Sequence, residues 1–393
     1  MYSILDLFAG CGGLGLGFKQ NKSFAIQLAN DIWEPAKKTY VYNNKEVPFI
    51  LSDIKNIDEV TIKKYIPKGV DIIIGGPPCQ GFSMCGTRDI NDVRNTLFYE
   101  YARIVNLTRP YVFIMENVKG LLSMKNPDGQ LVIDSIYKEF ESIGYNIKHK
   151  VLNAKYYGVP QSRERVIIVG TRADLPDNYE YPLKVFNDCS NYTVKDALEL
   201  LPNTDSENGE LKISNNNLNN YLKQIVGVKG LFNHKIPSHN NAVEHRMKFV
   251  PQGGNWKDIP EEFRAGGIHS NAYRRLKLDE TSVTIKHAYK SMIIHPIYNR
   301  CLSIREVARL QSFPDDYIFM DSRTSQYQQL ANAVPPFLSH ALADSVNEYL
   351  HKNNIREKRE WHNINEFQFD FFNIDKYTQE EQLNLFDRNN EVN

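Results

Sequence analysis

The sequence predicts an α/β fold with a mostly parallel sheet covered by helices on both faces, followed by a smaller irregular region. Short apolar runs recur through the first 170 residues and leave room for helices between them. Strands that alternate with helices in this way form parallel sheets. Over residues 172–240 the alternation stops, and loop-forming segments such as "NTDSENGE" and "NNNLNN" take its place.

The elements follow in order along the chain. The strands that we expect cover residues 2–8, 24–31, 48–54, 70–76, 111–118, 146–154 and 165–171. A helix is expected around residues 95–107. Ser303 and Glu306 have the spacing of a capping box, which predicts a helix start at Ser303. A further helix at about 336–350 follows "NAVPP", and the polar last forty residues are expected to pack poorly or to depend on a partner.

The bulk composition is that of a globular protein. The chain has 393 residues, of which 41% are hydrophobic, and no apolar run approaches the ~20 residues that span a bilayer. The N-terminus lacks the pattern of a secretory signal. The five cysteines are odd in number and show no Cys-x-x-Cys spacing, which argues against disulfides and a zinc site. We therefore expect a cytoplasmic protein with free thiols and no metal.

Charge is uneven along the chain although the formal net charge is zero. Residues 223–309 contain fifteen Lys and Arg against seven Asp and Glu, whereas residues 353–393 contain five against nine. A locally basic region is typical of phosphate binding, although a solvated lysine-rich surface has the same composition.

The first motif with chemical content is "DLFAGCGGLGLGF", at residues 6–18. It contains Gly-x-Gly-x-x-Gly at Gly10, Gly12 and Gly15, where a strand turns into a helix and the backbone can approach a ligand. Asp31 lies about twenty residues further on, where a strand end would place it on a ribose hydroxyl, and Asp53 is a further candidate at a strand end. The pattern indicates an adenosine-containing cofactor, either nicotinamide or S-adenosylmethionine, unless the glycines serve the turn alone.

The second motif is "GGPPCQGFS", which holds Cys79 between prolines and glycines directly after a strand. Proline fixes φ and glycine permits unusual backbone angles, so this context holds a thiol in position. A nucleophilic cysteine needs this placement, whereas Cys11, Cys189 and Cys301 have the context of buried structural cysteines.

Two further motifs carry charge at strand ends. Glu116 closes the apolar strand of "FIMENVKG", at the edge of a parallel sheet where ligands bind in α/β proteins. Arg163 and Arg165 alternate at the start of "RERVIIVG" and are suited to binding phosphate or carboxylate groups. Each motif alone also fits a cap or a surface ion pair.

The ordered series of motifs closely resembles the DNA (cytosine-5) methyltransferase family, of the bacterial restriction–modification type. The series runs "DLFAGCGGL", "ND", "SDI", "GGPPCQGFS", "ENV", "QSRER", "REVARLQSFPD" and "NAVPP". The resemblance implies a Rossmann-like S-adenosylmethionine-dependent methyltransferase domain at residues 1–175 and 295–350. It also implies a target-recognition domain at 176–294 and leaves a charged C-terminal tail at 351–393.

The resemblance assigns S-adenosylmethionine as the cofactor. The positions that match the cofactor motifs are Asp6, Phe8, Gly10, Gly12, Gly13, Leu14, Asp31, Ile32, Asp53, Ile54, Pro77, Asn332 and Val334. Ala331 departs from the glycine that is commonest at its position in the family, which affects the local turn.

The resemblance also implies covalent catalysis on a cytosine that is flipped out of the duplex. Cys79 would attack C6, Glu116 would act at N3, Arg165 would hold the base or Glu116, and Arg163 would support the nucleophile and nearby backbone. Gln80, Ser83 and Arg88 lie on a loop that closes over DNA in relatives. In the target-recognition domain, Arg274, Arg275, Lys286 and Lys290 are candidates for contacts with double-stranded DNA, and Thr281–Thr284 resembles an element of relatives.

Other interpretations remain. A nicotinamide-dependent oxidoreductase would use the glycine turn but explains neither Pro-Cys-Gln nor "NAVPP". A non-catalytic DNA-binding module would not need Cys79, Glu116 and Arg165 together, while a tRNA methyltransferase of the same architecture would share all three. We expect a monomer, with a cognate restriction endonuclease as a functional partner. The tail residues Gln382–Phe386, in "EEQLNLFD", resemble peptides that dock on sliding clamps.

Overall fold

The computed structural model contains a seven-stranded sheet with the strand order β3-β2-β1-β4-β5-β7-β6. Its strands are β1 (Tyr2–Leu7), β2 (Phe24–Asp31), β3 (Phe49–Leu51), β4 (Ile72–Gly75), β5 (Val112–Val118), β6 (Tyr145–Asn153) and β7 (Glu164–Arg172). The structure describes residues 1–78, 97–126, 129–188, 191–209, 213, 218–227, 229–264, 272–358 and 360–361.

The sheet is mostly parallel, as predicted. Strands β1 to β5 pair in parallel, while β7 pairs antiparallel with both β5 and β6. The C-terminal ends of β1, β2, β4 and β5 therefore meet at one edge, which we call the carboxyl edge. Because β7 runs in the opposite direction, its first residues lie at this same edge, with Arg165 paired to Val118.

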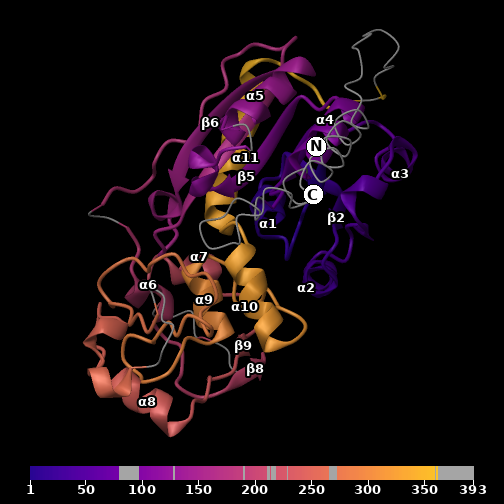
Figure 1. Ribbon diagram of the computed structural model, residues 1–393. Helices are drawn as coiled ribbons and strands as arrows, with labels where there is room; N and C mark the ends of the chain where they lie inside the picture. The colour runs from indigo at the N-terminus through magenta and orange to yellow at the C-terminus, as the bar shows by residue number, and fades with distance from the viewer. Residues whose placement is uncertain are drawn as a thin grey trace, which may run out of the picture. The chain divides into compact units, whose positions relative to one another are not determined.

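Helices cover both faces of the sheet, because successive strand residues point to opposite sides. Ile4 and Ile114 belong to one buried cluster, together with side chains of α1 (Gly13–Gln20) and α11 (Pro336–Lys352). Leu5 and Met115 belong to another, which packs against the opposite face. This second face carries α3 (Glu59–Tyr65), α4 (Leu97–Thr108) and α5 (Val132–Ser142), and α2 (Glu34–Asn43) follows β2. Figure 1 shows α1 beside the long helix α11.

The later part of the chain is irregular, as predicted. It contains α6 (Val194–Leu198), α7 (Leu222–Ile225), α8 (Asn241–Lys248), α9 (Ile304–Leu310) and α10 (Arg323–Asn332), with a short pair of strands, β8 (Ser206–Asn208) and β9 (Phe232–His234). In Figure 1, α6, α7, α9 and α10 lie together. The predicted capping box at α9 is confirmed: Ser303 Oγ accepts from the amide of Glu306, whose carboxylate accepts from the Ser303 amide at 2.7 Å.

Residues 353–361 form a segment that we call the strap, and its described residues pack on the amino edge of the sheet. The carbonyl of Ile355 accepts from the hydroxyl of Tyr2. The buried Lys358 donates through Nζ to the carbonyls of Thr108 and Arg109 at 3.0 and 2.6 Å. The indole of Trp361 donates to the carbonyl of Ile66 at 2.8 Å.

The start of the predicted tail at residues 351–393 is therefore part of the fold. Its first residues end α11 and then pack as the strap. Met1–Trp361 form one compact unit, and the second unit, His362–Asn393, lies outside the described residues. Across the described part of the chain, no helix is both long and apolar enough to cross a membrane.

Candidate active site

A buried ion pair joins two strands at the carboxyl edge. Nε of Arg165, near the start of β7, lies 2.7 Å from Oε1 of Glu116 on β5. The two residues are only 9% and 8% exposed. A buried carboxylate is costly unless it is paired, so Arg165 allows Glu116 to stand at the end of an apolar strand. The family resemblance implied that Arg165 holds either the base or Glu116, and the structure contains the second of these contacts.

The turn that leads to Cys79 is attached to the same strand. Nδ2 of Asn117 donates to the carbonyl of Pro77 at 3.1 Å. A Cβ atom built on Gly76 would lie 3.1 Å from Oε2 of Glu116, so the carboxylate packs directly against this turn. Cys79 itself lies outside the described residues, as do Gln80, Ser83 and Arg88. The described part of the turn ends at Pro78, one residue before the predicted nucleophile.

Arg163 connects β7 to the "NAV" motif. Its side chain is 1% exposed and donates to the carbonyls of Ala331 and Ala333 at 2.7 and 2.9 Å. Burial lowers the pKa of its guanidinium well below the usual value. The described contacts of Arg163 are therefore with backbone that leads to Asn332 and Val334, and we treat it as a positioning residue rather than a catalytic one.

The glycine turn uses its glycines for two purposes. Gly10 has φ of +56°, and a Cβ atom there would meet only the carbonyl of Phe8 at 4.0 Å, so space for a ligand remains on this side. At Gly12 and Gly13 the space is filled by the protein. A Cβ on Gly12 would lie 2.8 Å from the hydroxyl of Tyr317, and one on Gly13 would lie 2.4 Å from the carbonyl of Val334.

Asp31 fixes this turn. Its Oδ2 accepts from the amide of Gly10 and its Oδ1 from the amide of Trp33, both at 2.8 Å. Burial raises the pKa of the Asp31 carboxyl, and these two hydrogen bonds oppose the rise. Each oxygen retains a lone pair for a further donor such as a ribose hydroxyl. The adjacent Ile32 is 68% exposed, which leaves an apolar surface beside the turn.

The prediction that Asp6 contacts the cofactor is corrected by its position. Asp6 is 0% exposed on β1, and a Cβ atom on Gly15 of α1 would lie 2.7 Å from its Oδ2. The carboxyl therefore lies beneath the glycine turn and cannot reach a ligand. Similarly, the Ile54 side chain is 3% exposed and belongs to the core, so that only its backbone could reach a ligand, whereas the preceding Asp53 is not buried.

The remaining predicted cofactor residues lie where α1 meets the C-terminal segment. Phe8 has φ of +52° at the start of the turn. Leu14 and Val334 are buried in the cluster beneath α1 and α11. Asn332, at the end of α10, is exposed and accepts through Oδ1 from Nε2 of Gln328 at 2.9 Å. Because α10 was not predicted from the sequence, the support of Asn332 by this helix was missed.

The four predicted DNA contacts of the irregular region differ in exposure. Lys286 and Lys290 are exposed, and Arg274 is half-buried. Arg275 is 5% exposed and donates to the carbonyls of Met247, Val250, His295 and Tyr298. The prediction that Arg275 contacts DNA is therefore wrong, because its guanidinium already joins the end of α8 to the segment at residues 295–298.

The element at residues 281–284 is joined to the start of β7. The Ser162 amide donates to the carbonyl of Ser282 at 2.7 Å, and the Ser282 amide donates to the carbonyl of Pro160 at 2.9 Å. Thr284 Oγ1 donates to the carbonyl of Ser162 at 2.6 Å. Ser162 precedes Arg163, so the irregular region is bonded directly to the segment that carries both arginines. The sequence analysis noted the element but not this connection.

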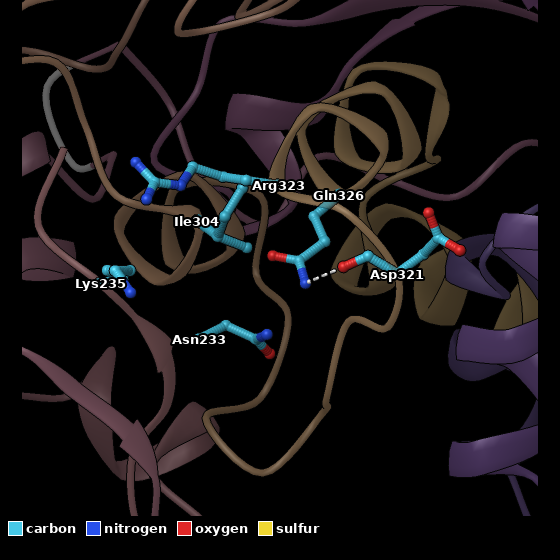
Figure 2. Close-up of a pocket in the computed structure, with 6 residues that line it drawn as sticks. All are labelled: Asn233, Lys235, Ile304, Asp321, Arg323 and Gln326. Carbon is cyan, nitrogen blue, oxygen red and sulfur yellow. Dashed lines mark hydrogen bonds between the residues drawn. The ribbon is translucent and has the colours of Figure 1, made fainter.

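A separate cleft of about 240 Å³ lies between the end of β9, α9 and the start of α10 (Figure 2). Figure 2 shows Gln326 with its side-chain nitrogen directed to the carbonyl of Asp321. The residues that line the cleft are Asn233, Lys235, Ile304, Asp321, Arg323 and Gln326. None of these belongs to the predicted catalytic or cofactor set, and we assign the cleft no part in the reaction.

Comparisons of the sequence and of the structure with known proteins agree with one another. The family model of C-5 cytosine-specific DNA methylases matches residues 2–348. The Type II methyltransferase M.DdeI of Desulfomicrobium norvegicum is 39% identical over an alignment of 383 positions that covers 90% of each chain. The Type II methyltransferase M1.HphI of Haemophilus parahaemolyticus is 35% identical and covers 87% of this chain and 86% of its own. A crystal structure of a prophage-encoded DNA modification methyltransferase from E. coli superposes with a TM-score of 0.70 at 25% identity, covering 89% of this chain and 100% of its own.

Proposed function

The chain belongs to the family of C-5 cytosine-specific DNA methylases, and from this premise we propose that Cys79, Glu116 and Arg165 carry out methyl transfer to a cytosine of double-stranded DNA. One observation supports these assignments above all. The ion pair of Glu116 and Arg165 packs against the turn that leads to Cys79, at the edge of the sheet where α/β enzymes bind their substrates.

S-adenosylmethionine fits the residues of the glycine turn. The open side of Gly10, the carboxylates of Asp31 and Asp53 and the exposed Ile32 provide backbone approach, acceptors for hydroxyl and amino groups, and an apolar surface. Phe8, Asn332 and Val334 complete the proposed site. When bound, this cofactor supplies an electrophilic methyl group.

The residues of the chain then have to make cytosine reactive, because C5 of the free base is a poor nucleophile. In the proposed reaction the Cys79 thiolate adds to C6, and the electron pair of the C5–C6 double bond becomes available at C5 for the methyl group. Glu116 acts as the proton donor to N3, which stabilises the negative charge that develops on the ring. Loss of the C5 proton expels Cys79 and restores the aromatic ring. Arg165 keeps Glu116 in place throughout.

Target recognition is proposed for residues 176–294. A cytosine inside a duplex hides C6 in the stack, so the base must be flipped out at a cost of a few kcal/mol. Arg274, Lys286 and Lys290 are the described candidates for DNA contacts, with Gln80, Ser83 and Arg88 on the loop after Cys79. The hydrogen bonds of Ser282 with Ser162 and Pro160 support coupling between DNA binding and the arginines of β7.

The cellular setting follows from the relatives, which are named Type II methyltransferases. We propose a monomer in the cytoplasm that protects DNA from a cognate restriction endonuclease.

Gln382–Phe386, the proposed sliding-clamp peptide, lie outside the described residues. A clamp pull-down that is unchanged by Leu385→Ala and Phe386→Ala would contradict that part of the proposal.

The decisive experiment measures the transfer of labelled methyl groups from S-adenosylmethionine to mixed-sequence duplex DNA, with an RNA pool in parallel. We expect label at cytosine C5 in DNA, none with Cys79→Ser, and full transfer with the control Cys85→Ser six residues further on. Label on RNA alone would preserve the chemistry and overturn the substrate. Cofactor binding without transfer to either pool would contradict the catalytic assignment.

A further inference from the structure

Asp6 is a buried carboxyl group with almost no hydrogen-bond partner. It lies two residues after the core residue Ile4 on β1, on the same face of the sheet, and is 0% exposed. Its Oδ1 accepts no hydrogen bond from the described residues, and its Oδ2 lies 3.4 Å from the hydroxyl of Tyr40, at the limit of a hydrogen bond. An ionised carboxylate in this place would lack the compensation that buried charges require.

Asp71, which directly precedes β4 of the same sheet, is a buried carboxylate whose charge is compensated by hydrogen-bond donors. It is 1% exposed, yet its oxygens accept from the Ser3 amide at 2.7 Å, the Ser3 hydroxyl at 2.9 Å and the Lys358 amide at 2.7 Å. Burial raises the pKa of both carboxyls, and for Asp6 it raises the pKa to about 8. The two carboxyls differ in how many hydrogen-bond donors they meet, and each donor stabilises the charged form and so opposes the rise in pKa.

Among the described residues, the ionisable groups that act on Asp6 do not include a cation. Asp6 interacts electrostatically with the carboxyl of Asp31 on β2 and with the hydroxyl groups of three tyrosines, which are Tyr40 of α2, Tyr101 of α4 and Tyr317. The positive end of the α1 dipole favours an anion, but no amide of that turn donates to Asp6 among the described hydrogen bonds. The protonation state of Asp6 is therefore determined mainly by desolvation, which favours the neutral acid over the carboxylate.

We propose that Asp6 works as an uncharged carboxylic acid beneath the glycine turn, and that cofactor binding weakens when this proton is lost. Gly15 packs on Asp6 Oδ2, and the Asp31 carboxylate holds the amide of Gly10 at the other end of the same turn. A second negative charge would repel Asp31 and draw water into the packing under α1. The identity of the cofactor rests on the proposed function, whereas the protonation state of Asp6 does not.

The protonation state is tested first, without cofactor. Carboxyl ¹³C resonances of aspartate-labelled protein are followed between pH 4 and 9, and Asp6 is assigned as the signal that Asp6→Asn lacks. We expect it to titrate near pH 8, about four pH units above an ordinary aspartate. Titration below pH 5 would overturn the proposal. Should Asp6→Asn fail to fold, Tyr40→Phe provides the assignment, since it changes the environment of the same carboxyl.

The effect on the cofactor site is tested with S-adenosylhomocysteine, whose sulfur is uncharged and does not attract a carboxylate directly. If only the protonated form binds, affinity at pH 8.5 should be about fourfold weaker than at pH 6.5 in the wild type. Asp6→Asn should bind equally at both values, and the control Asp71→Asn should retain the wild-type pH dependence. Equal pH dependence in wild type and Asp6→Asn would overturn the proposal. Absence of binding at every pH would instead contradict the proposed identity of the cofactor. The carboxyl resonance would still report the protonation state of Asp6 in that case.

Discussion

Nε of Arg165 lies 2.7 Å from Oε1 of Glu116 at the junction of two strands that run in opposite directions. The reversal of β7 is what makes this contact possible, because it brings the start of one strand beside the end of another. The other carboxylate oxygen faces Gly76, in the turn that leads to Cys79. A single ion pair thus orients Glu116 toward the segment that carries the proposed nucleophile.

Arg165→Leu should abolish methyl transfer and destabilise the protein by about 3–5 kcal/mol, because it leaves Glu116 buried without a counter-charge. The double variant Glu116→Gln with Arg165→Leu removes both charges and should recover much of this stability while remaining inactive. Chemical unfolding of the wild type, Arg165→Leu, Glu116→Gln and the double variant gives the interaction free energy of the pair through a double-mutant cycle. Additive losses in the double variant would show that the pair does not interact.

Asn117→Ala should reduce kcat while leaving cofactor binding unchanged. The substitution removes the hydrogen bond to the Pro77 carbonyl, which costs about 1–3 kcal/mol when the acceptor stays buried. A shift of the turn by about 1 Å would lower the rate ~100-fold. Single-turnover methyl transfer measures the effect, with Asn178→Ala, which breaks an amide pair with Asn353, as the control. A normal rate would mean that the turn is held by other contacts.

Gly13→Ala should destabilise the fold and weaken cofactor binding together. The new methyl group would meet the Val334 carbonyl at 2.4 Å, and overpacking of this kind costs about 1–3 kcal/mol. Gly120→Ala is the matched control, because its nearest contacts would be at 3.8 and 4.0 Å. Thermal unfolding and cofactor titration of both variants make the comparison. Wild-type behaviour of Gly13→Ala would show that the "NAV" segment can move away freely.

Stability should fall as the pH is lowered from 6.5 toward 4, through His295. Burial lowers the pKa of this imidazole to about 4, so the unfolded chain binds more protons than the folded one in that interval. A single group with this shift contributes on the order of 3 kcal/mol. Burial also lowers the pKa of His234 and His287. Unfolding measured at pH 7 and 4.5 should show a smaller loss for His295→Asn than for wild type or the exposed control His351→Gln.

The sequence predicted most of the sheet and the helix at Ser303, because alternating apolar runs and a capping box are local signals. It also predicted that Glu116 and Arg165 act together, through the resemblance to a family. The burial of Arg275 could not be predicted, because its four carbonyl partners come from segments up to 28 residues away. Asp6 was misplaced for a similar reason: its motif indicates a ligand, whereas its position beneath α1 depends on how the helix packs.

The strap also has a practical consequence for engineering. Through Tyr2 and Ile355 it brings the two ends of the Met1–Trp361 unit to the edge opposite Glu116. A short linker from Trp361 back to Met1 would therefore close the unit into a loop, and new termini could be opened elsewhere by circular permutation. Split or permuted forms of the enzyme could then be built with the catalytic edge left untouched.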